Sequence, residues 1–142
     1  MISVPAAPPQ RRLATLAALA LVALLVAGCF PRASDIKNLP EASFGFPGST
    51  LVESHSRDGS LTAGGASLVF TYEVEASWNS ISTYYHDQLA ALGYEQQPDG
   101  LTSTGPTNEY KKDSRFASLE HELSEPGAEG QATRYLYVIF QD

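Results

Sequence analysis

The sequence predicts an α+β domain in which one helix packs on an antiparallel sheet of four or five strands, in two layers. Residues 78–92 repeat apolar side chains with helical spacing, whereas 67–76 and 115–124 alternate side chains with the period of a strand. The elements follow one another in the order strand, strand, helix, short strand, strand, strand. Packing the helix on a single sheet is the simplest arrangement of these elements.

Two strands are predicted before the helix. The first covers residues 49–56, and the polar stretch 56–66, which contains Asp58-Gly59 and Gly64-Gly65, connects it to the second. The second strand, 67–76, is the clearer one, because one of its faces is entirely apolar and the other is mostly polar. The apolar face consists of Leu68, Phe70, Tyr72 and Val74.

The helix is predicted to run from Trp78 to Leu92. Ser77 precedes it, and a serine hydroxyl at this position can accept a hydrogen bond from an early backbone N–H. Gly93 follows it and is free to take the positive φ that ends many helices. The predicted buried stripe consists of Trp78, Ile81, Tyr85, Leu89 and Leu92.

Three strands and a loop are predicted after the helix. A short strand over 94–97 leads into a polar loop over 98–107, and a strand over 108–112 continues after a break as 115–124. The last strand, 133–141, is apolar on both faces and is therefore expected at the centre of the sheet. Its two faces are Leu136, Val138 and Phe140, and Tyr135, Tyr137 and Ile139.

The first 28 residues have the layout of a secretory signal peptide. Arg11 and Arg12 precede a run over 13–28 that consists of Leu, Ala, Val and Gly apart from Thr15. This run is shorter than the about 20 residues that a membrane span requires. Pro31 follows soon afterwards and cannot continue a helix. The arginine pair alone does not define a twin-arginine signal, so the export route stays open.

The end of the apolar run resembles the lipobox of bacterial lipoprotein precursors. Val26 occupies the branched aliphatic position and Cys29 the invariant one, while Ala27 and Gly28 fill the two small positions between them. The resemblance implies that the Cys29 thiol receives a diacylglycerol and that the leader is cleaved between Gly28 and Cys29. It also implies acylation of the new amine, giving an N-acyl cysteine, in many organisms. The alternative is an ordinary leader or an uncleaved anchor in which Cys29 has no role.

Cleavage before Cys29 leaves 114 of the 142 residues, which is enough for one domain. These residues hold all 16 acidic side chains and seven of the nine basic ones, for a net charge of −9. Such a charge argues against a nucleic acid partner. It also argues against adhesion to anionic lipid, so the acyl chains are expected to hold the protein at the membrane. With the only cysteine lipidated, no thiol remains for a disulfide or a metal site.

Residues 29–48 are predicted to be a lipidated cysteine and a tether that leads to the domain, 49–142. Residues 30–48 contain three prolines and two glycines and show no apolar period. Fully extended at about 3.3 Å per residue, the tether would reach roughly 60 Å from the membrane. Phe44 and Phe46 are expected to pack on the edge of the domain.

The reactive side chains form no recognisable catalytic motif. The three histidines are His55, His86 and His121, and no Gly-x-Ser-x-Gly sequence occurs. Glu120-His121-Glu122 resembles a metal-binding cluster, but on a strand His121 points away from both glutamates. We therefore predict no metal, no cofactor and no catalytic residue.

Seven tyrosines are many for a domain of this size, and they are expected either in the core or at a recognition surface. If the domain has a binding face, Tyr84, Tyr135 and Tyr137 are the tyrosines expected on it, because they lie beside or opposite the apolar faces assigned above. The end of the helix, with Tyr85, Leu89, Gly93 and Tyr94, also resembles small exported lipoproteins over residues 47–95. That resemblance implies a fold and no particular activity.

Three hypotheses about function follow. The first is an exported lipoprotein, lipid-anchored to the outer face of the cytoplasmic membrane, or to an outer membrane if the organism has one. In this hypothesis the domain is a non-catalytic binding or accessory module whose partner is an envelope protein. The second is a small envelope hydrolase that uses His86 or His121 with a carboxylate. The third is a carrier of a small apolar ligand, held between helix and sheet in a cavity lined by Trp78 and Tyr85.

Overall fold

The structure is a computed structural model that describes residues 30–60, 62, 64–98, 100–102, 105–122 and 132–142. The predicted signal peptide and Cys29 lie outside these residues. The chain divides into two units, and the second, Pro31–Asp142, contains every helix and strand described below.

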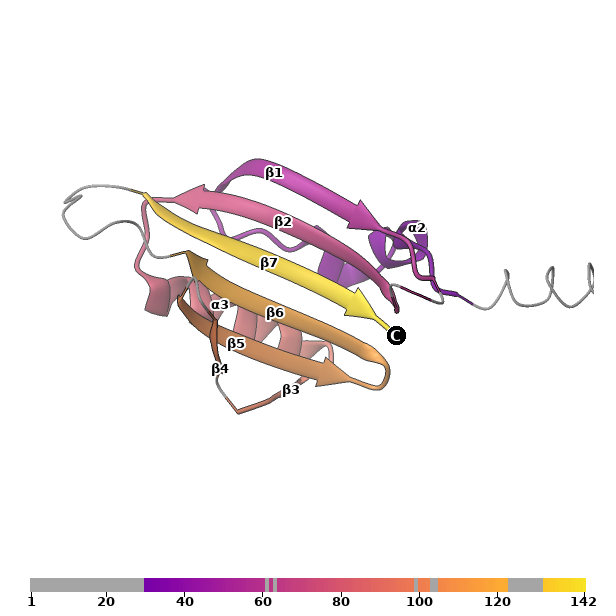
Figure 1. Ribbon diagram of the computed structural model, residues 1–142. Coiled ribbons are helices and arrows are strands. Elements are labelled where there is room, and N and C mark those ends of the chain that lie inside the picture. Colours follow the sequence, from indigo (N-terminus) through magenta and orange to yellow (C-terminus); the bar gives the residue numbers. More distant parts are fainter. Residues whose placement is uncertain (1–29, 61, 63, 99, 103–104, 123–131) are drawn as a thin grey trace, which may run out of the picture. The chain divides into compact units, whose positions relative to one another are not determined.

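The domain is α+β, as predicted, and its antiparallel sheet has seven strands in the described part of the chain (Figure 1). Six strands follow the order β1-β2-β7-β6-β5-β3, and β4 pairs with β5. The strands are β1 (Thr50–Arg57), β2 (Ala66–Val74), β3 (Glu95–Gln96), β4 (Gly100–Thr102), β5 (Gly105–Lys112), β6 (Arg115–Glu122) and β7 (Thr133–Gln141).

The predicted count of four or five strands is wrong because β4 was not foreseen, and because the single interrupted strand predicted over 108–124 is two paired strands, β5 and β6. β4 and the first part of β5 lie in 98–107, which was predicted to be a loop. There, the backbone of residues 100–102 pairs with that of residues 105–107. The paired residues are only three to seven positions apart, so this is a local hairpin, and the proline and glycine residues that indicate a loop are also compatible with it.

Strand β7 lies between β2 and β6, which confirms the predicted central position. Its side chains alternate between two faces of the sheet. The inner face carries Tyr135, Tyr137 and Ile139, which are all fully buried. The outer face carries Leu136, Val138 and Phe140, which are partly exposed.

The main helix, α3 (Trp78–Ala91), begins and ends as the sequence predicts. The Ser77 side chain accepts a hydrogen bond from the backbone N–H of Ser80, and Gly93 has a φ of 84°. Ile81, Tyr85 and Leu89 are buried. Tyr85 reaches the inner face, where its ring centroid lies 4.6 Å from that of Tyr137. The helix therefore packs on the inner face of the sheet.

Residues 31–48, here called the N-terminal segment, do not form the predicted tether. They fold into α2 (Ala33–Lys37) and the 3₁₀ helix η1 (Pro40–Ser43). Ala33 and Ile36 are buried in the hydrophobic core. Phe44 and Phe46 pack against the core as expected. The folded domain therefore begins at Pro31 and not at Ser49.

The width of the sheet explains why the N-terminal segment is folded. A helix is about 10–12 Å wide with its side chains and strands lie about 4.8 Å apart, so one helix covers two to three strands. Helix α3 contacts β3 and β6, whereas α2 contacts β2 and β7. The N-terminal segment thus covers the part of the inner face that α3 does not reach.

A buried carboxylate fixes the N-terminal segment on the sheet. The Glu41 side chain is 1% exposed, and its Oε1 accepts hydrogen bonds from Tyr94 Oη at 2.5 Å and Arg115 Nη1 at 2.9 Å. The backbone carbonyl of Glu41 also accepts a hydrogen bond from the Tyr137 hydroxyl. Because a buried charge is tolerated only when it is paired, this network specifies one position for η1.

Replacing Arg115 with methionine should lower the free energy of unfolding by about 3 kcal/mol, because the Glu41 carboxylate would lose its counter-charge. Urea unfolding of Arg115→Met measures this loss. The control is Lys37→Met, since Lys37 is exposed on α2, and it should change the stability by less than about 0.5 kcal/mol. Equal effects of the two substitutions would contradict a structural role for the Glu41–Arg115 pair.

Candidate functional site on the outer face of the sheet

Partly exposed apolar side chains gather on the outer face of the three central strands, β2, β7 and β6. Phe116 pairs with Phe140 across β6 and β7, and Val69 pairs with Val138 across β2 and β7. Leu136 follows on the same face of β7. All of these side chains are partly exposed. We call the surface formed by Val69, Phe116, Leu136, Val138 and Phe140 the outer patch.

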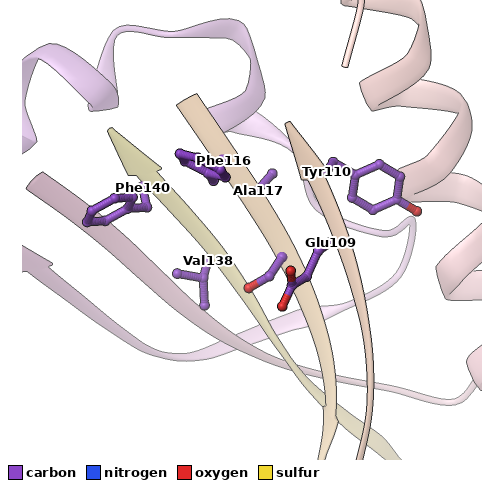
Figure 2. A pocket seen from close by; sticks show the side chains of 7 residues that line it. Glu109, Tyr110, Phe116, Ala117, Val138 and Phe140 are labelled. Carbon is purple, nitrogen blue, oxygen red and sulfur yellow. The ribbon is translucent and has the colours of Figure 1, made fainter. Parts of the chain in front are cut away.

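A shallow hollow of about 230 Å³ lies over one side of the outer patch. It is lined by Glu109, Tyr110, Phe116, Ala117, Ser118, Val138 and Phe140. Figure 2 shows Phe116 and Phe140 on neighbouring strands, while the ring of Tyr110 points away from both. Pockets for small molecules usually have volumes of about 300–1,000 Å³. The hollow is therefore the right size for one side chain of a partner rather than for a cofactor.

Charged side chains of both signs border the outer patch. On the β5 side, Lys111 Nζ lies 5.2 Å from the centroid of the Phe116 ring, and Glu109 is exposed. On the β1 side, the exposed His55 Nε2 lies 2.8 Å from Glu53 Oε1. An apolar centre with a charged border is the usual composition of a protein–protein contact surface.

Strand β1 forms one edge of the sheet but is poorly suited to pair with another strand. It has a bulge between Leu51 and Glu53, and all of its residues are exposed. Bulges and charged side chains on edge strands oppose edge-to-edge pairing. Leu51 and Val52, which are 49% and 47% exposed, therefore add apolar surface without offering a regular strand edge.

A second hollow, of about 450 Å³, lies where β3 meets the turn between β5 and β6. It is lined by Gly93, Glu95, Gln97, Lys111, Lys112 and Asp113. The Lys112 ammonium donates a hydrogen bond to the carbonyl of Leu92 at 2.5 Å. Two carboxylates and two ammonium groups line this hollow, so its charge does not favour a ligand of either sign.

Two of the three tyrosines predicted on a binding face lie in the core instead. Tyr135 and Tyr137 are fully buried, and only Tyr84 is partly exposed, with its ring edge-on to Phe46. The Tyr135 hydroxyl oxygen lies 3.3 Å from the hydroxyl oxygen of Tyr85. It also accepts a hydrogen bond from the backbone N–H of Phe46 at 3.4 Å. The phenol groups face inward because the N-terminal segment and α3 supply their hydrogen-bond partners.

The sequence analysis did not predict the outer patch, although the apolar character of both faces of β7 indicates that one of them is exposed. Both faces of β7 are apolar, and only one can lie against α3 and the N-terminal segment. The sequence does not say which face that is, because Tyr135 and Tyr137 alternate with Val138 and Phe140. The tyrosine face is the buried one, so Val138 and Phe140 face outward.

The three histidines lie on separate elements, and neither hollow includes one of them in its lining. His121 is on the inner face of β6, opposite to Glu120 and Glu122, as predicted from the strand alternation. Its ring stacks on Trp78 with centroids 4.8 Å apart. His86 is exposed on α3. Within the described residues, no three His, Cys, Asp or Glu side chains are placed to hold a metal ion.

Side chains fill the space that the carrier hypothesis assigned to a ligand. Tyr85 is fully buried, and its ring contacts those of Tyr84, Tyr135 and Tyr137. Trp78 is stacked on His121. The region between α3 and the sheet at these residues is packed core.

Comparison of the chain with protein-family models, with curated proteins and with solved structures found no match. Among the helices of the described residues, none has the length and apolar character needed to cross a membrane.

The domain should lose stability as the pH rises above about 10. Burial raises the pKa of Tyr85, Tyr94 and Tyr137 above the ordinary value of 10.0. As the pH rises above about 10, these phenols lose their protons in the unfolded chain before they do so in the folded domain. Each phenol then lowers the free energy of unfolding by about 1.4 kcal/mol per pH unit. Urea unfolding at about pH 9 and about pH 11 measures the loss, which Tyr85→Phe should reduce. Equal stability at the two pH values would contradict the prediction.

The fluorescence of Trp78, the only tryptophan, should report protonation of His121. Burial lowers the pKa of His121 below its ordinary value of 6.5. The neutral ring is the form favoured in the fold, so its contribution to stability is present above about pH 6.5 and is lost as the pH falls. A fluorescence titration should show quenching with a midpoint below 6.5. His121→Gln should abolish the transition and His86→Gln should retain it; the reverse pattern would refute the assignment.

Proposed function

We propose that this protein is an exported lipoprotein, anchored through Cys29, whose domain binds another protein of the cell envelope and does not catalyse a reaction. The lipobox formed by residues 26–29, at the end of the apolar run 13–28, supports the lipid anchor. The outer face of the cytoplasmic membrane is the proposed location, or the outer membrane where one exists.

The outer patch is the observation that carries the binding role. In the proposed two-layer arrangement, α3 and the N-terminal segment occupy the inner face and leave the outer face to a partner. Phe116, Val138 and Phe140 then form the apolar centre of the contact. Aromatic and aliphatic side chains that lose contact with water supply most of the favourable free energy in such contacts.

A protein partner fits this surface better than a small molecule does. The hollow of about 230 Å³ accepts one side chain, and the apolar surface continues beyond it to Val69 and Leu136 on β2 and β7. Glu109 and Lys111 border it with opposite charges, which orient a protein partner without attracting one kind of ion. The partner is expected to place an apolar or aromatic side chain over Phe116 and Phe140.

Site-specific photo-crosslinking in cells tests this proposal. A photoreactive amino acid replaces Phe140 in the full-length chain, and a matched version replaces Asp87, which is exposed on α3. A protein adduct of one size is expected from position 140 and none from position 87, because only the outer patch contacts the partner. Cys29→Ala should abolish the adduct by removing the anchor.

Two outcomes would contradict the binding role of the outer patch. One is the same adducts in the same yield from both positions, and the other is no adduct from position 140 in a chain that reaches the membrane. Circular dichroism of each variant verifies that the domain has folded.

A further inference from the structure

The chain is fixed to the body of the domain from Pro31 onward. The carbonyl of Pro31 accepts a hydrogen bond from the backbone N–H of Gly59 at 3.0 Å, and the N–H of Ala33 donates to Asp58 Oδ1 at 2.8 Å. Ala33 and Ile36 are 6% and 0% exposed. The N-terminal segment is therefore part of the packed structure at the point where it follows Cys29.

Only one residue, Phe30, separates Cys29 from Pro31. An extended residue spans at most about 3.6 Å, so the Cα of Cys29 lies within about 7 Å of the Cα of Pro31. The predicted tether would have allowed roughly 60 Å. A lipid carried by Cys29 would therefore bring one particular end of the domain to the bilayer surface.

That end, here called the anchor end, can be identified from the strand register. It consists of the connection between β1 and β2, the last residues of β7, and the turn between β5 and β6. The N–H of Asp142 donates to the carbonyl of Ser114 at 3.1 Å, and Ala66 pairs with Gln141. In Figure 1 this is the end of the sheet marked by α2 and the C-terminus.

The far end lies at the other end of the same strands. It holds the last residue of β2, the first residue of β7 and the start of α3, because Val74 pairs with Thr133 and the Thr133 hydroxyl donates to the carbonyl of Ala76 at 2.5 Å. Strands β2 and β7 are each nine residues long. At about 3.3 Å per residue, the far end lies roughly 30 Å from the anchor end.

The charges of the domain are distributed unequally between the two ends. Six of the seven Lys and Arg side chains of the mature chain lie at the anchor end: Arg32, Lys37, Arg57, Lys111, Lys112 and Arg115. The seventh, Arg134, is at the far end, where its Nε lies 2.9 Å from Glu122 Oε2. Carboxylates also gather at the far end: Glu73, Glu75, Glu120 and Glu122.

The anchor end also holds six carboxylates, so its net charge is close to zero: Asp35, Glu41, Asp58, Glu95, Asp113 and Asp142. The far end is strongly acidic. An anionic bilayer repels carboxylates within about a Debye length of its surface. Contact through the anchor end therefore costs less electrostatic free energy than contact through any surface that includes the far end. The short connection and the charge distribution favour the same orientation.

We propose that the domain stands end-on against the membrane surface, with the anchor end in contact with lipid headgroups and the far end roughly 30 Å away. This inference rests on the lipidation of Cys29 proposed above. The strands then run away from the bilayer, and the outer patch faces sideways, parallel to the membrane plane. A partner that binds the outer patch must therefore present its binding surface within roughly 30 Å of the membrane.

Tryptophan fluorescence of the full-length lipidated protein in vesicles tests the orientation. In a Trp78→Phe background, Ser114→Trp places the only tryptophan at the anchor end and Asn79→Trp places it at the far end; both positions are exposed. The vesicles contain phosphatidylethanolamine and phosphatidylglycerol, with a nitroxide quencher on a fraction of the headgroups. Quenching of the Ser114→Trp protein should be several-fold stronger than that of the Asn79→Trp protein.

A spacer provides the matched control. About 20 glycine and serine residues inserted between Phe30 and Pro31 span roughly 25 Å as a flexible chain, and the difference in quenching should largely disappear. Equal quenching at the two positions without the spacer would overturn the end-on orientation. Stronger quenching of the Asn79→Trp protein would overturn it as well.

Mass spectrometry of the purified protein separates this inference from the proposed function. The mass of a diacylglyceryl group on Cys29, combined with equal quenching at the two positions, refutes the orientation and leaves the lipid anchor intact. Absence of that mass refutes the lipid anchor and, with it, the orientation. Circular dichroism verifies that each tryptophan variant keeps the secondary structure of the native chain.

Discussion

The width of the sheet is the constraint on which the rest of the structure depends. Helix α3 spans the three strands β6, β5 and β3 of an inner face built from six neighbouring strands. Without a second cover, the inward side chains of β2 and of part of β7 would face water. The N-terminal segment supplies that cover with α2, η1 and the residues up to Phe46. The folded domain therefore begins two residues after Cys29, the predicted lipidation site. Residues 31–48 belong to the domain and do not act as a flexible tether.

The N-terminal segment is attached through polar groups as well as apolar ones. Glu41 is buried with Arg115 and Tyr94, and the hydroxyls of Tyr72 and Tyr137 donate to the carbonyls of Phe44 and Glu41. Apolar packing alone would allow a short helix to slide along the sheet. Hydrogen bonds to individual backbone atoms define its register, because each misplaced group would be buried without a partner. The abundance of tyrosine in this sequence is explained by that role in the core.

Sequence patterns predicted the elements whose burial follows a simple period. Helix α3, strand β2 and the central strand β7 were all recognised, because apolar spacing and the cap residues Ser77 and Gly93 act locally. The N-terminal segment was missed because its prolines and glycines indicate a linker and its helices are only five and four residues long. Its folding depends on Glu41 meeting Arg115, 74 residues further along the chain. The outer patch was missed for a related reason, since local patterns do not determine which apolar face of β7 is covered.

The two faces of β7 connect the architecture to the proposed function. Covering the inner face requires the N-terminal segment, and that requirement places the start of the folded domain one residue after Phe30. The same strand presents Val138 and Phe140 outward, on a face that runs from the anchor end toward the far end. A lipid on Cys29 would therefore limit both the height of the outer patch above the bilayer and the direction in which it faces. For a binding module, this confinement raises the effective concentration of a partner in the same membrane, because both proteins search a layer instead of a volume.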